Sequence, residues 1–117
     1  MASDSPHDQP VAGISETRGA LVVRLAGELD LYNAPVLREA LLDCLARSPS
    51  RLVLDLAEVT FVDSTVLGAL VEVRSKLGSR EGLVLAAPGL EARRALAVSG
   101  LDRHFSVTET VEGALGG

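Results

Sequence analysis

The order in which the hydrophobic pattern changes period along the chain is the feature that most restricts its fold. Short runs of β-branched and aliphatic residues, typical of strands, alternate with segments in which apolar residues recur every three or four positions, typical of helices. The first two strand-like runs are separated only by Arg18 and Gly19, a connection short enough for a hairpin. The pattern therefore predicts a hairpin followed by helices and strands in alternation.

The predicted element order is β-β-α-β-α-β-α-β-α. Strands separated by helices are parallel and need crossover connections, so the predicted fold class is α/β, with a mixed β-sheet, an N-terminal hairpin and about four helices. We expect strands at 11–17, 20–26, 51–56, 82–86 and 105–107, and helices at about 34–47, 63–77, 88–99 and 108–115. Asn33 is expected to cap the first helix, and residues 57–63 to connect a strand to the second helix.

The length of 117 residues fits a single domain. Apolar residues make up 47% of the chain but aromatic residues only 3%, so the core has to be built from leucine, valine and alanine. Residues 1–9 are polar and show no period, so we expect a disordered tail there and one domain over residues 10–117.

The charge pattern and the cysteine content restrict partners and location. The net charge of −5, with scattered basic residues, argues against binding to nucleic acid. No segment approaches the ~20 apolar residues that span a bilayer, and the N-terminus has no signal pattern, so we expect a cytoplasmic protein without a membrane partner. The single cysteine, Cys44, fits a reducing compartment and is interpreted as a buried small apolar residue.

Residues 61–68, Phe-Val-Asp-Ser-Thr-Val-Leu-Gly, carry the most functional information. Asp63, Ser64 and Thr65 are all good N-cap residues, although a helix needs only one. Simple capping explains one of them, and a surplus hydroxyl remains at the helix start. The nearly uncharged residues 66–71 follow. We expect some of their side chains to face the sheet and the rest to form an apolar surface that contacts a partner beside Ser64 and Thr65.

Three stretches resemble the signature sequences of the anti-sigma factor antagonists, which belong to the wider STAS domain group. They are Gly-Glu-Leu-Asp at 27–30, the segment 61–68, and Val-Ser-Gly-Leu at 98–101, and the resemblance covers roughly residues 11–115. It implies a regulator of sigma-factor-dependent transcription that binds an anti-sigma factor with serine kinase activity. It further implies that phosphorylation ends this binding and that a serine phosphatase restores it.

The same resemblance assigns roles by position. Ser64 matches the phosphorylated serine, with Thr65 as the alternative acceptor, Asp63 matches the aspartate before it, and Asp30 matches a loop aspartate near the same surface. These four, with Val66 and Leu67, form the predicted partner-binding site. Thr65 stands where the resemblance implies a serine and keeps a hydroxyl. Val66 stands where it implies a glycine, and we expect the bulk of Val66 beside the acceptor to narrow partner choice.

No catalytic residue, metal site or cofactor is predicted. The Gly-x-Ser-x-Gly pattern of serine hydrolases is absent around Ser64, and His104 is the only histidine outside the expected tail. The only lysine, Lys76, lies on a predicted helix, which argues against a phosphate-receiver domain that needs a lysine at the end of a strand. The chain is therefore expected to be a binding protein and not an enzyme.

A different binding role for the same fold remains open. The chain could serve as a STAS subunit of a transporter or as a scaffold in a stress-sensing complex. In that role Ser64 would only cap the helix, and residues 66–71 would bind a constitutive partner. The Asp63–Ser64 pair favours the antagonist.

Overall fold

A five-stranded sheet organises the computed structural model, which describes residues 9–78 and 82–116. The strands lie in sequence order across the sheet: β1 (Val11–Thr17), β2 (Ala20–Leu29), β3 (Arg51–Val62), β4 (Leu83–Ala86) and β5 (Ser106–Thr108). β1 pairs with β2 in antiparallel orientation, and every other pair is parallel. This arrangement confirms the predicted α/β fold with a mixed sheet and an N-terminal hairpin.

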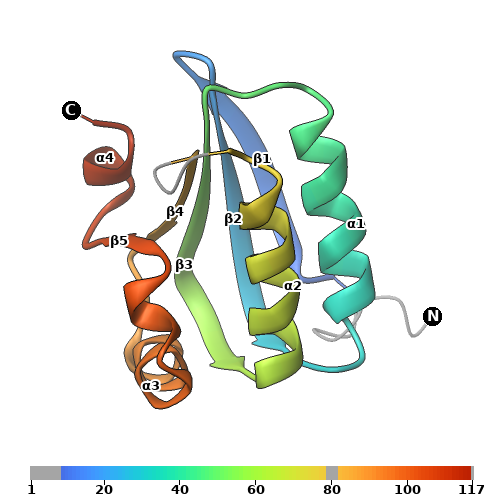
Figure 1. Ribbon diagram of the computed structural model, residues 1–117, viewed down its shortest axis with the longest axis vertical. Coiled ribbons are helices and arrows are strands. Elements are labelled where there is room, and N and C mark those ends of the chain that lie inside the picture. Colours follow the sequence, from blue (N-terminus) through green and yellow to red (C-terminus); the bar gives the residue numbers. More distant parts are fainter. Residues whose placement is uncertain (1–8, 79–81, 117) are drawn as a thin grey trace.

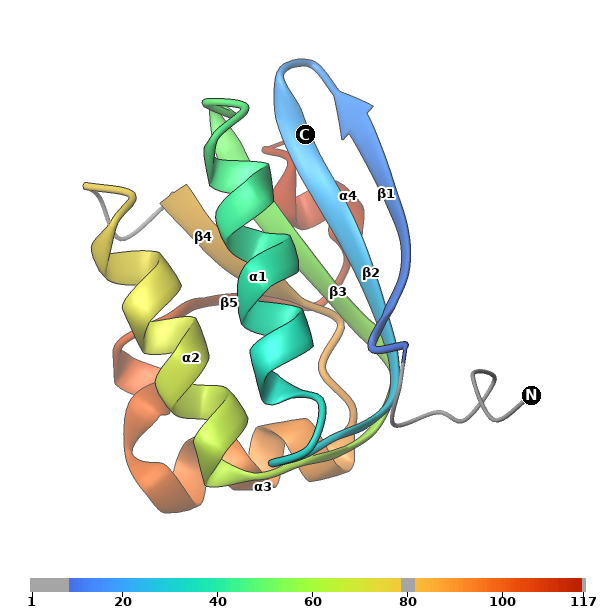
Figure 2. The ribbon, with the colours of Figure 1, turned by 90° about the vertical axis from the view of Figure 1, so that its right-hand side faces the viewer.

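The helices cover the two faces of the sheet unequally. They are α1 (Ala34–Leu45), α2 (Ser64–Ser75), α3 (Leu90–Ser99) and α4 (Val111–Ala114), with a short 3-10 helix η3 (Leu101–Arg103) after α3. Figures 1 and 2 show α1 and α2 side by side on one face, with α4 on the other. The larger core includes Leu52 and Leu54 of β3 with residues of α1, α2 and α3, while Val53 belongs to a smaller cluster with Ala114 of α4. The two-residue alternation of a strand explains this division.

β2 and β3 are both longer than the sequence pattern predicts. Residues 57–62, expected to be a connection, belong to β3 and pair with the end of β2, with register shifts between Arg24 and Ala26 and between Gly27 and Glu28. Because of these bulges the buried residues Leu56, Val59 and Val62 are three positions apart. The bulges thus break the alternation by which a strand is recognised in a sequence.

The extension of β2 and β3 brings the loops before α1 and α2 together. Carboxyl ends of parallel strands meet at one end of a sheet, and Figure 1 shows β2 and β3 ending beside the start of α2. The backbone N–H of Asp63 donates a hydrogen bond of 3.1 Å to the carbonyl oxygen of Leu29. Residues 30–33 and 61–65 therefore lie at the same end of the molecule, which we call the Ser64 end.

The remaining predictions concern the N-terminal tail, the end of helix α3 and membrane-spanning segments. The expected tail at 1–9 lies, apart from Gln9, outside the described residues. Helix α3 ends at Gly100 in the left-handed region, with φ +75°, next to the predicted end of this helix at residue 99, and Leu96 and Leu101 both pack into the larger core. Within the described ranges, no helix is long and apolar enough to cross a membrane.

Candidate functional site

Ser64 opens helix α2 without being the residue that caps it. The cap is Asp63, which has an extended backbone and whose Oδ1 accepts a hydrogen bond of 3.2 Å from the backbone N–H of Val66. The side chain of Ser64 is exposed, and no residue in the described part of the chain makes a hydrogen bond with its hydroxyl. The capping role and the accessible hydroxyl thus belong to different residues.

Asp30 shapes the loop that faces this helix start. Its Oδ1 accepts hydrogen bonds from the backbone N–H groups of Tyr32, at 3.0 Å, and Asn33, at 3.2 Å. The side chain of Asn33 makes two further hydrogen bonds in this loop. Its Oδ1 accepts from the backbone N–H of Asp30 at 2.9 Å, and its Nδ2 donates to the carbonyl oxygen of Glu28 at 2.7 Å. The Asp30 carboxylate therefore holds the turn between β2 and α1.

Asn33 occupies the N-cap position of α1, as expected, but the expected hydrogen bond from its side chain to the first turn of the helix is absent. Asn33 is fully buried and makes no side-chain cap bond to the helix. Burial requires its amide to be satisfied, and the nearby backbone groups of Glu28 and Asp30 supply both partners. The side chain therefore stabilises the loop rather than the first turn of the helix.

Val66 and Leu67 do not belong to the exposed surface on which the sequence placed them. Val66 is 0% exposed and Leu67 is 4% exposed, and both lie in the larger core with Leu70 and Val73 of the same helix. These positions form the stripe by which α2 packs on the sheet. The bulk of Val66 therefore faces the core and not the surroundings of Ser64. Of residues 66–71, Gly68, Ala69 and Val71 remain to contribute to the expected surface.

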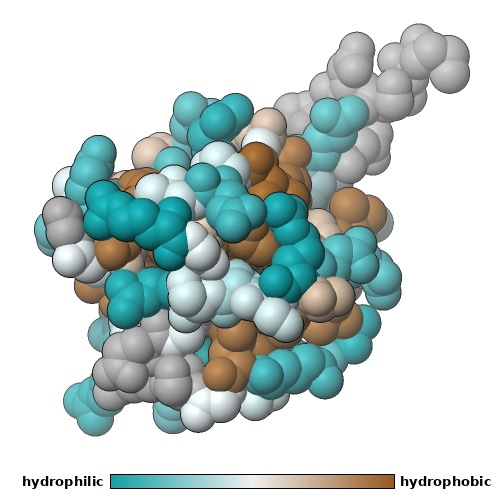
Figure 3. Space-filling model, turned by 90° about the horizontal axis from the view of Figure 1, so that it is seen from above, coloured by the Kyte–Doolittle hydropathy of each residue, from teal (hydrophilic) through white to brown (hydrophobic). Residues whose placement is uncertain are grey.

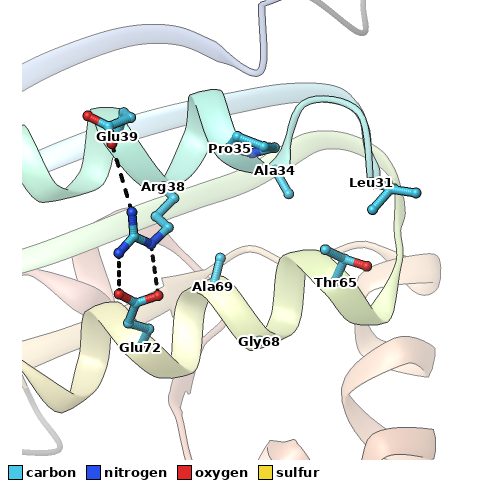
Figure 4. A pocket seen from close by; sticks show the side chains of 9 residues that line it. All are labelled: Leu31, Ala34, Pro35, Arg38, Glu39, Thr65, Gly68, Ala69 and Glu72. Carbon is cyan, nitrogen blue, oxygen red and sulfur yellow. Dashed lines mark hydrogen bonds and ion pairs between the residues drawn. The ribbon is translucent and has the colours of Figure 1, made fainter.

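The outer side of α2 instead borders a groove against α1, which we call the α1–α2 groove. Its volume is about 370 Å³, and Figure 4 shows its lining residues. They come from both helices and the loop before α1: Leu31, Ala34, Pro35, Arg38, Glu39, Thr65, Gly68, Ala69 and Glu72. Thr65 is thus the predicted site residue that faces the groove, directly after Ser64.

An ion pair lies at the end of the groove opposite Leu31 and Thr65 (Figure 4). Arg38 Nε donates to Glu72 Oε1 at 2.8 Å, and a second bond joins the same two side chains. The bond from Arg38 holds the pKa of the Glu72 carboxyl below its usual range, and Glu72 raises the pKa of Arg38. Both groups stay charged at neutral pH and cancel each other, although Glu39 also approaches Arg38 at 3.8 Å.

Large exposed side chains at the Ser64 end were missed by the sequence analysis. Leu31 is 59% exposed and Tyr32 is 81% exposed in the loop before α1, and Phe61 is half-exposed near the end of β3. The chain has one tyrosine and two phenylalanines, and only Phe105 of these is buried. Tyr32 stands in a turn-forming segment between Asp30 and Pro35, and this position is the signal that could have identified it as a surface residue.

The opposite end of the molecule has a different character. Figure 3 views that end, where hydrophilic residues surround smaller hydrophobic areas. Over residues 9–78 and 82–116, no group of three or more histidine, cysteine, aspartate or glutamate side chains is arranged to hold a metal ion. The Ser64 end combines an exposed serine, the groove and exposed apolar side chains.

Comparisons with known proteins all point to the same protein family. The STAS domain family matches residues 12–114. Anti-sigma-F factor antagonist RsfB of Mycobacterium tuberculosis is 33% identical over 113 residues, which cover 97% of this chain and 93% of that protein. The anti-sigma-B factor antagonist of Bacillus subtilis is 33% identical over 104 residues, covering 87% and 94%. A crystal structure of an anti-sigma factor antagonist from Mycobacterium paratuberculosis has a TM-score of 0.82 at 36% identity, covering 89% of each chain.

Proposed function

The chain belongs to the anti-sigma factor antagonists of the STAS domain family, and we propose that it binds an anti-sigma factor only while Ser64 is unphosphorylated. In this proposal the anti-sigma factor is also the serine kinase that modifies Ser64. Binding frees the sigma factor for transcription, phosphorylation ends the binding, and a serine phosphatase restores it. The observation that carries the proposal is the exposed Ser64 hydroxyl at a helix start that Asp63 already caps.

The fold tolerates a phosphate on Ser64 in this proposal. A phosphoserine carries about −1.5 to −2 charges at neutral pH. The N-terminus of a helix favours negative charge by about 0.3–1 kcal/mol, because its free N–H groups and its dipole both point toward the added group. Since the Ser64 side chain is exposed and does not cap α2, no contact of the folded domain has to break.

In this proposal the same phosphate prevents the complex with the anti-sigma factor from forming. Asp63 is the adjacent residue, so phosphorylation puts two anionic groups at one helix terminus. A partner that packs apolar or acidic groups against Thr65 and Leu31 would have to desolvate or repel this charge. A loss of about 2.8 kcal/mol is already a hundredfold in affinity.

Two measurements test the proposal together. The purified domain is incubated with Mg-ATP and each serine-kinase anti-sigma factor encoded in its own genome, and phosphate is mapped by mass spectrometry. We expect label on Ser64, with Thr65 as the alternative acceptor. Label at any other position, or no label with every such kinase, contradicts the proposal.

Binding of the same anti-sigma factors is then measured by titration calorimetry. Ser64→Ala should bind whether or not ATP is present, and Ser64→Asp should bind at least tenfold more weakly at an unchanged melting temperature. Ser15→Asp adds the same charge at an exposed position of β1 and serves as the control. Equal affinities for wild type and Ser64→Asp would instead support a constitutive partner, as in the transporter-subunit or scaffold role.

A further inference from the structure

The α1–α2 groove exists because the facing residues of the two helices are small. Packed helices lie about 8–10 Å apart, and side chains normally fill the space between them. Here α2 presents Gly68 and Ala69, and α1 presents Ala34 and Pro35. A Cβ atom added at Gly68 would meet no atom within 4 Å, so the groove is open at this residue.

The electrostatics of the groove select an uncharged occupant. Arg38, the cation among the lining residues, is engaged by Glu72 through two hydrogen bonds. A phosphate or carboxylate entering the groove would have to compete with Glu72 and would meet Glu39 as well. The rest of the lining is aliphatic or small, apart from the Thr65 hydroxyl. An apolar side chain suits this lining better than a nucleotide or another anion.

The mouth of the groove lies beside the proposed phosphorylation site. Figure 4 shows Leu31 and Thr65 at one end of the groove and the Arg38–Glu72 pair at the other. Thr65 directly follows Ser64, so a protein docked over the Ser64 hydroxyl also covers this mouth. We propose that the groove receives one apolar side chain of the anti-sigma factor, with Leu31 covering it and Gly68 leaving the room for it. This inference rests on the proposed function and adds the anchor of the complex.

A single apolar side chain buried in the groove would account for much of the affinity of the complex. Side chains that enter well-packed, water-excluding pockets at the centre of an interface account for most of its affinity. A phosphate on Ser64 would keep water at the mouth and prevent the anchor from being desolvated. One modified hydroxyl would thus disable a whole interface without changing the fold.

The first test fills the groove from within. Gly68→Leu places a leucine in the open space at Gly68 and also replaces a glycine inside a helix, so the domain should fold at least as stably as wild type. Ala46→Leu is the matched control, because Ala46 is exposed at the far end of α1. We expect Gly68→Leu to weaken binding of the anti-sigma factor at least tenfold and Ala46→Leu to leave it unchanged. Leu31→Ala should weaken binding as well, since it removes the cover of the anchor.

The second test reports directly on the groove. Cys44, the only native cysteine, is buried, and burial raises the pKa of its thiol, so an environment-sensitive maleimide dye attaches selectively to Gly68→Cys. Ala46→Cys carries the same dye as the control. We expect either a blue shift of the dye at position 68 when the anti-sigma factor binds, or loss of binding for the protein labelled at position 68 alone. Binding without a spectral change at position 68 overturns the inference.

The outcomes separate this inference from the proposed function. Suppose that wild type binds, Ser64→Asp does not, and Gly68→Leu binds like wild type. The groove inference is then wrong and the phosphorylation switch stands. If no anti-sigma factor binds the unphosphorylated wild type, the proposed function fails and the groove inference fails with it.

Discussion

Arg38 of α1 and Glu72 of α2 are 34 residues apart in the sequence and form a two-bond ion pair that joins the helices, with Arg38 Nε 2.8 Å from Glu72 Oε1. Both side chains are about 40% exposed, so solvent screens the pair and its contribution to stability is small. Its main consequence is geometric, because it links the two helices at the end of the groove opposite Thr65.

The contribution of this ion pair to the free energy of unfolding should be lost at acidic pH but should not change at alkaline pH. The hydrogen bond from Arg38 lowers the pKa of Glu72 in the folded state, so the stabilisation is complete above the ordinary glutamate pKa of about 4.3 and is lost as the pH falls through the lower folded value. We expect Glu72→Gln to be less stable than wild type at pH 7 and equally stable in strong acid. Urea unfolding from pH 9 to pH 2 measures this difference, and a constant difference over the whole range would contradict the assignment.

The cap of α2 should contribute to stability through Asp63. Asp63→Ala removes the acceptor of the Val66 N–H and should lower the free energy of unfolding by about 1 kcal/mol. Asp63→Asn keeps an oxygen acceptor at the cap and should stay within a few tenths of a kcal/mol of wild type. Chemical denaturation compares the three proteins. An equal loss of stability for Asp63→Asn and Asp63→Ala would show that the charge of Asp63, and not its hydrogen bond to the Val66 N–H, is what matters.

Val66 should affect folding and not partner choice. Val66→Gly empties a fully buried position and puts a glycine into a helix. The expected cost is about 3 kcal/mol, from the cavity and the weaker helix propensity together. Thermal unfolding tests it, with the exposed Thr65→Ala as control. Unchanged stability with altered partner preference would instead support the role that the sequence alone suggested.

Alanine substitutions at two glycines, Gly68 and Gly100, should change the free energy of unfolding in opposite directions. Gly68 lies inside α2 with open space around it, so Gly68→Ala should stabilise the domain by about 0.5–1 kcal/mol. Gly100 has a φ of +75° at the end of α3, so Gly100→Ala should destabilise it by about 1 kcal/mol. Urea denaturation of both variants beside wild type measures the signs, and equal signs would contradict this description of the two positions.

The sequence pattern predicted much of the fold correctly. Element order, strand orientation and the start of α2 at Asp63–Ser64 follow from local periodicity and cap residues, which act over a few neighbouring positions. The extension of β3 was not predictable, because its bulges space the buried Leu56, Val59 and Val62 three apart. The role of Asn33 was also hidden, since it depends on backbone groups that only the completed loop brings near it.

By itself the sequence determined the order of helices and strands, and that more cap-forming residues stand at the start of α2 than a helix needs, with Ser64 among them. Residues 66–71 are almost uniformly apolar, so no periodicity could show which of them face inward. Only packing against the sheet decided that Val66 and Leu67 are core residues and that Thr65, Gly68 and Ala69 border a groove. The physical reason is that a groove needs two helices, and the residues that form its two sides are neighbours in space but not in sequence.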